Sequence, residues 1–219
     1  MTAADFAKKV DHTILKANAT YAEIRETILY AREIGAASVC LNPVHVPLAA
    51  ELLKGTATKV CTVTGFPLGA NTKEGKAEEA KAACAAGAQE IDMVMNISAL
   101  KSGDHATVRA DVAAVVQAVA PVTVKVILEN CYLTAEEIVD ACRLAEEGGA
   151  HYVKTSTGLG PWGAKAEDVE LMRKSVSPNV KIKAAGGIAT LADAQAMLDA
   201  GADRLGLSRT AAILAELEG

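Results

Sequence analysis

Three ionisable residues, Asp92, Lys154 and Lys183, stand inside runs that are otherwise mostly apolar. A charged side chain in such a run is costly unless it has a partner or a function. Two ammonium groups ~5 Å apart would repel by roughly 3 kcal/mol at an effective dielectric of ~20, which lowers the pKa of one of them by about 2. A neutral amine attacks carbonyl carbons to form imines, and a nearby aspartate moves the protons. Two lysines and one aspartate therefore suffice for aldol chemistry without a metal.

Two further charged residues, Lys125 and Glu129, lie four positions apart, the first within the apolar run 122–128 and the second directly after it. Residues two or four apart on a strand point to the same face. The sequence therefore favours an ion pair between Lys125 and Glu129, with Lys125 in a supporting position.

A repeated pattern indicates which elements hold these residues. Gly-Ala pairs at 35–36, 87–88, 149–150 and 201–202 each follow a helical segment and precede an apolar strand. The repeat is roughly 50–60 residues, about twice a βα unit of ~30. Strands of a second kind at 59–63, 122–128 and 180–184, with a first one near 10–15, bring the count to eight.

Eight strands alternating with helices predict an α/β fold, a parallel eight-stranded (β/α)8 TIM barrel, built as one domain over residues 1–219. A short extra N-terminal helix over 3–9 is expected to cover the barrel bottom. An open doubly wound sheet fits less well, because no G-x-G-x-x-G follows the first strand. Lys154 and Lys183 then stand near the carboxyl ends of strands six and seven, where barrel enzymes place their chemistry.

Glycine-rich turns after the last three strands predict an anion site. Backbone amides at glycine turns and helix N-termini bind anions, and the loops after strands seven and eight are the usual phosphate position in this fold. Arg209 either pairs with the phosphate or is merely solvated. The residues expected at the phosphate are Gly158, Gly186, Gly187, Gly206, Ser208 and Arg209.

Composition excludes several classes of function. The net charge is −5 with no block of like charges, so neither nucleic acid nor an anionic membrane is an expected partner. No signal peptide and no run able to span a bilayer is apparent. Five cysteines without a C-x-x-C pair indicate reduced thiols in the cytoplasm. The scattered histidines predict no metal site, and no other cofactor is expected.

Six motifs together resemble one family, the deoxyribose-phosphate aldolases. The resemblance extends from about residue 10 to 214. The motifs are DHTILK at 11–16, VCLNP at 39–43, GFPLG at 65–69, EIDMVMN at 90–96, VKTSTG at 153–158 and IKAAGGI at 182–188.

The resemblance implies a class I, metal-independent aldehyde-lyase that cleaves 2-deoxy-D-ribose 5-phosphate reversibly to D-glyceraldehyde 3-phosphate and acetaldehyde. It implies that Lys154 forms the Schiff base, that Lys183 perturbs Lys154 and joins proton transfer, and that Asp92 donates and accepts protons. Asp11 and Thr13 are expected to support them from strand one. A homodimer is also implied.

Cys40 and three departures from the family pattern leave questions open. Cys40 either faces the pocket or is a small buried hydrophobe, and burial is favoured. Leu159, Asn130 and Arg209 differ from the residues usual in the family, which bears on substrate preference rather than on reaction type.

Two other functions stay open. One is a Schiff-base lyase acting on a different sugar phosphate. The other is a non-catalytic barrel that binds sugar phosphates. The presence of both Lys154 and Lys183 argues against the second, since binding alone needs no paired buried amines.

Overall fold

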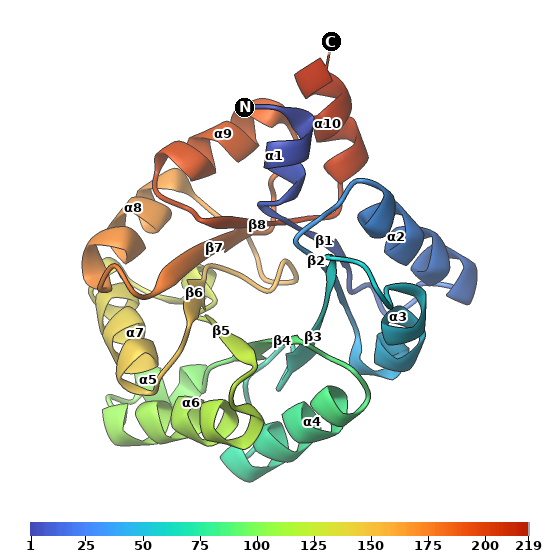
Figure 1. Ribbon diagram of the computed structural model, residues 1–219. Coiled ribbons are helices and arrows are strands. Elements are labelled where there is room, and N and C mark those ends of the chain that lie inside the picture. Colours follow the sequence, from blue (N-terminus) through green and yellow to red (C-terminus); the bar gives the residue numbers. More distant parts are fainter. Residues whose placement is uncertain (219) are drawn as a thin grey trace.

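Eight parallel strands close into a barrel in the order of the sequence, in a computed structural model that describes residues 1–218. The strands surround the axis in Figure 1, and the helices form a ring outside them. The predicted parallel (β/α)8 barrel is confirmed, and the open doubly wound alternative is wrong. The strands are β1 (Val10–Ile14), β2 (Ser38–Leu41), β3 (Lys59–Thr64), β4 (Glu90–Val94), β5 (Thr123–Ile127), β6 (Tyr152–Lys154), β7 (Lys181–Ala185) and β8 (Arg204–Leu207).

Several helices begin at residues whose side chains cap the first turn. Thr20, Thr134 and Thr190 each accept a hydrogen bond from the third helical residue, and the acidic side chain there bonds back to the cap. The helices are α1 (Ala3–Ala7), α2 (Tyr21–Glu33), α3 (Val46–Leu52), α4 (Lys73–Ala85), α5 (Ile97–Lys101), α6 (His105–Val119), α7 (Ala135–Glu147), α8 (Ala166–Ser175), α9 (Leu191–Asp199) and α10 (Thr210–Glu218), with 3-10 turns η1 (Pro43–His45) and η2 (Asn130–Tyr132).

The N-terminal helix is present but does not close the barrel bottom. Helix α1 packs beside α10. It lies over the wall near β8 and β1 rather than across the axis (Figure 1). Phe6 explains this place, because its fully buried ring joins the apolar layer between strands and helices.

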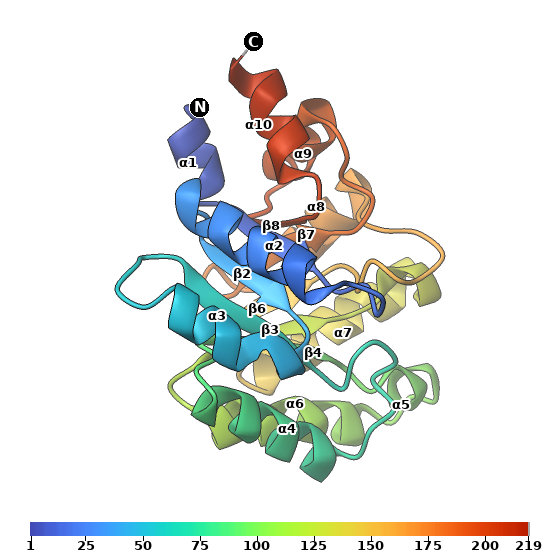
Figure 2. The same ribbon diagram turned by 90° about the vertical axis from the view of Figure 1, so that its right-hand side faces the viewer.

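The strands separate two interiors of different chemistry. Ile91 and Met93 of β4 belong to the apolar layer under the helices. Glu90 and Asp92 have the opposite parity and are also buried. The inside of the barrel therefore holds charges, while the shell around it supplies the hydrophobic stabilisation. Figure 2 shows from the side how the helices cover the strands. Among the described residues, no helix has the length and apolar character to cross a membrane.

One buried ion pair lies outside the barrel. Lys76 of α4 donates to Asp111 of α6 at 2.7 Å and to the carbonyl of Val94 at 2.8 Å. Burial lowers the pKa of Lys76 and raises the pKa of Asp111, although the attraction between the two charges opposes both shifts. The pair fastens α4 and α6 to the carboxyl end of β4.

Candidate active site

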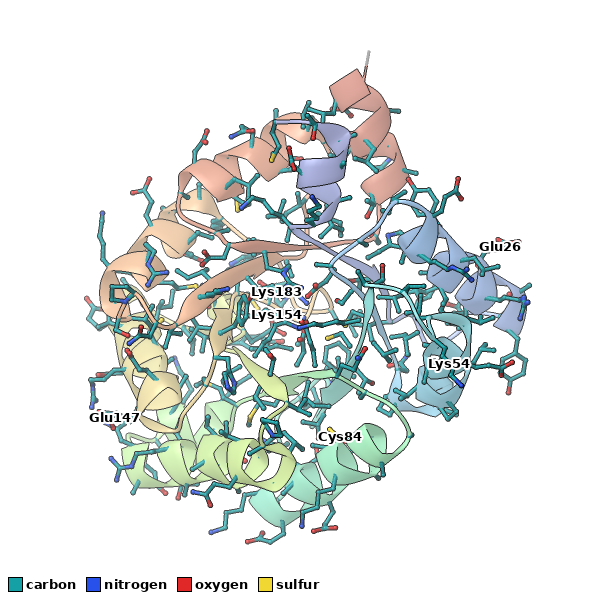
Figure 3. All side chains as sticks on the ribbon, viewed as in Figure 1. Glu26, Lys54, Cys84, Glu147, Lys154 and Lys183 are labelled. Carbon is teal, nitrogen blue, oxygen red and sulfur yellow. The ribbon has the colours of Figure 1, made fainter. Side chains whose placement is uncertain are left out.

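A cavity of about 510 Å³ opens at the carboxyl ends of the strands. Its volume is within the range of small-molecule sites, roughly 300–1,000 Å³. Residues after β1, β6, β7 and β8 line it, and Lys154 lies in its wall. Figure 3 shows Lys154 and Lys183 side by side near the barrel axis, whereas Cys84 and Glu147 lie on the outer helices.

Lys154, Lys183 and Asp92 are in direct contact. Lys154 and Lys183 are in-register partners on the neighbouring strands β6 and β7. Each ammonium nitrogen lies 2.7 Å from the same oxygen, Oδ2 of Asp92. The two nitrogens are therefore no further apart than twice that distance, which is the close approach expected from the sequence. Asp92 therefore shares one carboxylate oxygen between the two lysine nitrogens.

The charge states of Asp92 and Lys183 follow from their neighbours. Burial raises the pKa of Asp92, but the positive charges of Lys125, Lys154 and Lys183 lower it well below its ordinary value. Burial lowers the pKa of Lys183, but the negative charges of Asp11 and Asp92 raise it overall. At neutral pH Asp92 is therefore a carboxylate and Lys183 an ammonium group.

The three residues belong to a larger group of buried charges that we call the inner charge cluster. Its members face the barrel axis from β1, β4, β5, β6, β7 and β8. The cluster comprises the carboxylates Asp11, Glu90 and Asp92 and the cationic side chains Lys125, Lys154, Lys183 and Arg204.

The partner expected for Lys125 is wrong. Lys125 does not pair with Glu129; its nitrogen lies 2.6 Å from Glu90 Oε2 and 2.8 Å from Asp92 Oδ1. Parity along β5 is not sufficient, because the chain turns into a left-handed conformation at Glu129. Glu129 instead accepts hydrogen bonds from Thr157. Lys125 is thus a member of the cluster, and burial, which lowers its pKa, is outweighed by Asp11, Asp92 and Glu90.

The other supporting residues lie at different depths. Thr13 lines the cavity. Asp11 lies beneath the cavity, 2.5 Å from Lys183 and 2.6 Å from Arg204. Cys40 is fully buried beside Cys61 in a small apolar group, and it does not line the cavity. This is the buried alternative for Cys40.

Sequence reasoning missed two cluster members and part of the cavity wall. Glu90 shares the parity of Asp92 on β4, a signal that could have identified it. Arg204 gives no such signal, because its partner Asp11 lies at the other end of the chain. His12, Lys16 and Thr157 also line the cavity.

The turns after β6, β7 and β8 meet in one wall of the cavity. Five of the six residues expected at the phosphate line it, and Arg209 does not: the five are Gly158, Gly186, Gly187, Gly206 and Ser208. Within residues 1–218, the backbone amides of Gly158, Gly187 and Ser208 donate to no protein acceptor. Unpaired amides from three turns provide donors for an anion.

Glycine is required at two places in this wall. Gly186 and Gly187 have φ values of 85° and 75°, a left-handed conformation that other residues adopt only with strain. At Gly206, a Cβ would lie 2.8 Å from Ala185 Cβ and 3.1 Å from Lys183 Cε. A side chain at position 206 would therefore occupy space that Lys183 needs to reach the cluster.

Comparison with known proteins decides the family. The sequence model described as DeoC/LacD family aldolase matches residues 6–214. The chain belongs to this family. A deoxyribose-phosphate aldolase of Thermoanaerobacter sp. is 55% identical over 215 residues, which cover 97% of this chain and 96% of that protein.

Solved structures of aldolases share the fold of this family member. The structure named QR15, an aldolase, has a TM-score of 0.93 at 41% identity, covering 98% of this chain and 96% of its own. Deoxyribose phosphate aldolase from Aeropyrum pernix, described as a unique tetramer, has a TM-score of 0.92 at 31% identity, covering 100% of this chain and 93% of its own.

Of the departures from the usual aldolase pattern, Leu159 and Asn130 lie at different depths around the cavity. Leu159 lines it and is 59% exposed. Asn130 is buried behind the cavity and donates to Asp168 at 3.3 Å. Neither residue contacts the inner charge cluster, and of the two Leu159 alone lines the cavity.

Thiols and carboxylates in the aldolase barrel also come close enough to share a metal ion. The ligand atoms of Cys40, Cys61 and Asp92 lie within 4.8 Å of one another. Two of these three residues already accept hydrogen bonds from an ammonium group: Lys125 donates to Cys61 at 3.3 Å and to Asp92 at 2.8 Å. A divalent cation at this place would have to displace lysine charges.

His12 is expected to make the stability of this aldolase depend on pH. Its Nδ1 lies 2.8 Å from Thr210 Oγ1, and burial lowers the pKa of His12 to about 4. Between about pH 6.5 and 4 the unfolded chain takes up a proton that the folded chain does not, so stability falls as the pH falls. From pH 7 to about 4.5 this residue should cost about 2 to 3 kcal/mol.

Urea unfolding at the two pH values, on the parent and on His12→Asn, measures this cost. The parent should lose more free energy of unfolding than the variant by that amount. Equal losses in both proteins would mean that His12 does not carry the pH dependence.

Proposed function

We propose that this chain cleaves 2-deoxy-D-ribose 5-phosphate reversibly to D-glyceraldehyde 3-phosphate and acetaldehyde, through a Schiff base on Lys154. The observation that carries the proposal is the charge balance of the inner charge cluster. Three carboxylates face four cationic side chains. Loss of one proton leaves the cluster neutral, and Lys154 is the one of these four cations that lines the cavity.

A neutral Lys154 begins the reaction. Its Nζ attacks the aldehyde carbon C1 of the open-chain sugar, and Lys183 donates a proton to the carbonyl oxygen. The attacking nitrogen gives up one of its protons, the new hydroxyl takes up one proton and leaves as water, and the product is a protonated imine. The buried carboxylate of Asp92 stabilises this positive charge, because it already lies 2.7 Å from Lys154.

The protonated imine then accepts electrons. The C3 hydroxyl gives up its proton, the C2–C3 bond breaks, and its electron pair moves toward the nitrogen to form an enamine. C3 leaves as the aldehyde carbon of D-glyceraldehyde 3-phosphate. Protonation of C2 and addition of water release acetaldehyde and return the amine. Asp92 and Lys183 share the proton transfers, since both contact the reacting nitrogen or its hydrogen-bond partner.

The phosphate is proposed to bind at the turns after β6, β7 and β8. The unpaired amides of Gly158, Gly187 and Ser208 support this assignment, together with the glycines at 186 and 206. Arg209 is exposed and lies outside the cavity wall. Its proposed part is to attract the phosphate as the substrate approaches.

Borohydride trapping tests the proposal. Intact mass is measured after 2-deoxy-D-ribose 5-phosphate or acetaldehyde is added with borohydride to the parent and to Lys154→Ala. The parent should gain one reduced adduct, and Lys154→Ala should gain none. An adduct that persists in Lys154→Ala would move the nucleophile elsewhere, and no adduct in the parent would favour a barrel that only binds sugar phosphates.

Two controls complete this experiment. Turnover should survive a chelator, because the proposed steps use lysines and a carboxylate. A panel of sugar phosphates separates the proposed substrate from those of a related Schiff-base lyase. We further propose a cytoplasmic homodimer, and sedimentation of the purified chain measures its assembly.

A further inference from the structure

A buried carboxyl group behind the cavity has no part in the proposed chemistry. Glu129 follows β5 and is 2% exposed. No ion pair involves it within residues 1–218. Its backbone has φ 58° and ψ 62°. Among residues 1–218, Glu129 is the one residue other than glycine that has a positive φ. Such strain persists where the surrounding structure fixes it, and it is concentrated at functional sites.

Glu129 holds the turn that follows the proposed nucleophile. Its Oε1 accepts the backbone amide of Thr157 at 3.1 Å, and its Oε2 accepts the hydroxyl of Thr157. The same hydroxyl oxygen accepts the backbone amide of Leu159 at 3.0 Å. Three hydrogen bonds, which we call the Glu129–Thr157 clasp, therefore fix the turn 157–159 on both sides of Gly158.

The turn also packs tightly against the residues around Glu129. A Cβ at Gly160 would lie 2.7 Å from Cys131 Sγ and 3.4 Å from the carboxyl group of Glu129. The amide of Asn130 donates to the carbonyl of Thr155 at 3.0 Å. The turn after β6 is thus held by the turn after β5.

The clasp leaves the amide of Gly158 unpaired in the cavity wall. The amides of Thr157 and Leu159 are used within the clasp, whereas Gly158 lies between them in the cavity wall with an unpaired amide. The turn also lies close to the glycine turn after β7, since a Cβ at Gly186 would lie 3.3 Å from Gly158 Cα. Moving residues 157–159 would therefore change the phosphate site more than the amine of Lys154.

We propose that Glu129 is a positioning residue that sets specificity for phosphorylated substrate by holding the Gly158 amide in the anion site through Thr157. Fixed donors bind an anion without the entropic cost of ordering a loop. This inference rests on the proposed function, because it assigns the phosphate to the turn at Gly158.

Glu129→Gln and Thr157→Val test the inference, because each keeps the shape of its side chain and removes part of the clasp. Each should raise KM for 2-deoxy-D-ribose 5-phosphate by about tenfold, equivalent to about 1.4 kcal/mol. KM for unphosphorylated 2-deoxy-D-ribose should change by less than about twofold. Thr157→Ser, which keeps the hydroxyl, should restore the parent KM for the phosphorylated sugar.

A double-mutant cycle and a matched control separate positioning from general damage. Glu129→Gln with Thr157→Val should be no worse than either single variant, because both break one clasp. Glu79 forms a similar clasp with Thr64 Oγ1 at 2.7 Å and Gly65 N at 2.8 Å, on a turn that does not line the cavity. Glu79→Gln should leave the ratio of the two KM values unchanged.

Three results would overturn the inference. KM could rise equally for both sugars, the increases in KM could be additive in the double variant, or Glu79→Gln could change the ratio of the two KM values. If Glu129→Gln does not fold, Thr157→Val and Thr157→Ser decide alone. Borohydride trapping of each variant distinguishes failure of this inference from failure of the proposed function, because trapping at Lys154 does not depend on the clasp.

Discussion

Replacing Lys183 with Leu is expected to lower kcat at neutral pH by roughly 10²–10⁴-fold, the range that a positioned proton donor contributes. Lys183 lies 2.5 Å from Asp11 and 2.7 Å from Asp92. Without its charge, the inner charge cluster is balanced only when Lys154 keeps its proton. A protonated Lys154 cannot attack a carbonyl, so trapping by borohydride should also fail at neutral pH.

The pH profile of the Lys183→Leu variant separates this loss from misfolding. Activity should return in part as the pH rises, because the free amine is the form that attacks a carbonyl. Lys181→Leu is the matched control, since Lys181 lies on the same strand but is exposed. Near-normal turnover of Lys183→Leu at neutral pH, or a loss that does not depend on pH, would contradict the assigned role.

The contact between Lys154 and Lys183 could be predicted because it depends on patterns along single strands. The Gly-Ala repeat gave the order of the strands, and parallel strands put their carboxyl ends together. Each lysine interrupts an apolar strand just before a turn. Neighbouring strands in one register then place the two side chains beside each other.

The partners of Lys125 and Arg204 could not be predicted from the same patterns. Lys125 meets Asp92 because β4 and β5 pair in a register that aligns these two residues. Arg204 meets Asp11 only because β8 closes the barrel on β1. The alternation of side chains along one strand does not show how that strand aligns with its neighbours or how the barrel closes. It therefore led to the wrong partner, Glu129, for Lys125. The left-handed backbone at Glu129 is a tertiary feature of the same kind, held in place by Thr157.

Asp92→Asn is expected to lower kcat by a similar factor, roughly 10²–10⁴-fold, but with the opposite effect on the charge of Lys154. Removing this carboxylate leaves the inner charge cluster with excess positive charge, which favours the neutral amine. Lys154 should therefore still be trapped by borohydride with acetaldehyde, while turnover fails because the asparagine neither takes up nor releases a proton and does not stabilise the imine. In contrast with Lys183→Leu, raising the pH should not restore activity.

Asp111→Asn is the control for the cost of breaking a buried ion pair. Removing one partner of such a pair costs about 3–5 kcal/mol of stability, so both Asp92→Asn and Asp111→Asn should unfold at lower urea concentration than the parent. Asp111 pairs with Lys76 outside the barrel, and its variant should keep the parent kcat. If Asp92→Asn loses its trapped adduct and recovers activity at high pH, the charge argument for this residue is wrong, and Asp92 acts as the base that takes the proton from Lys154.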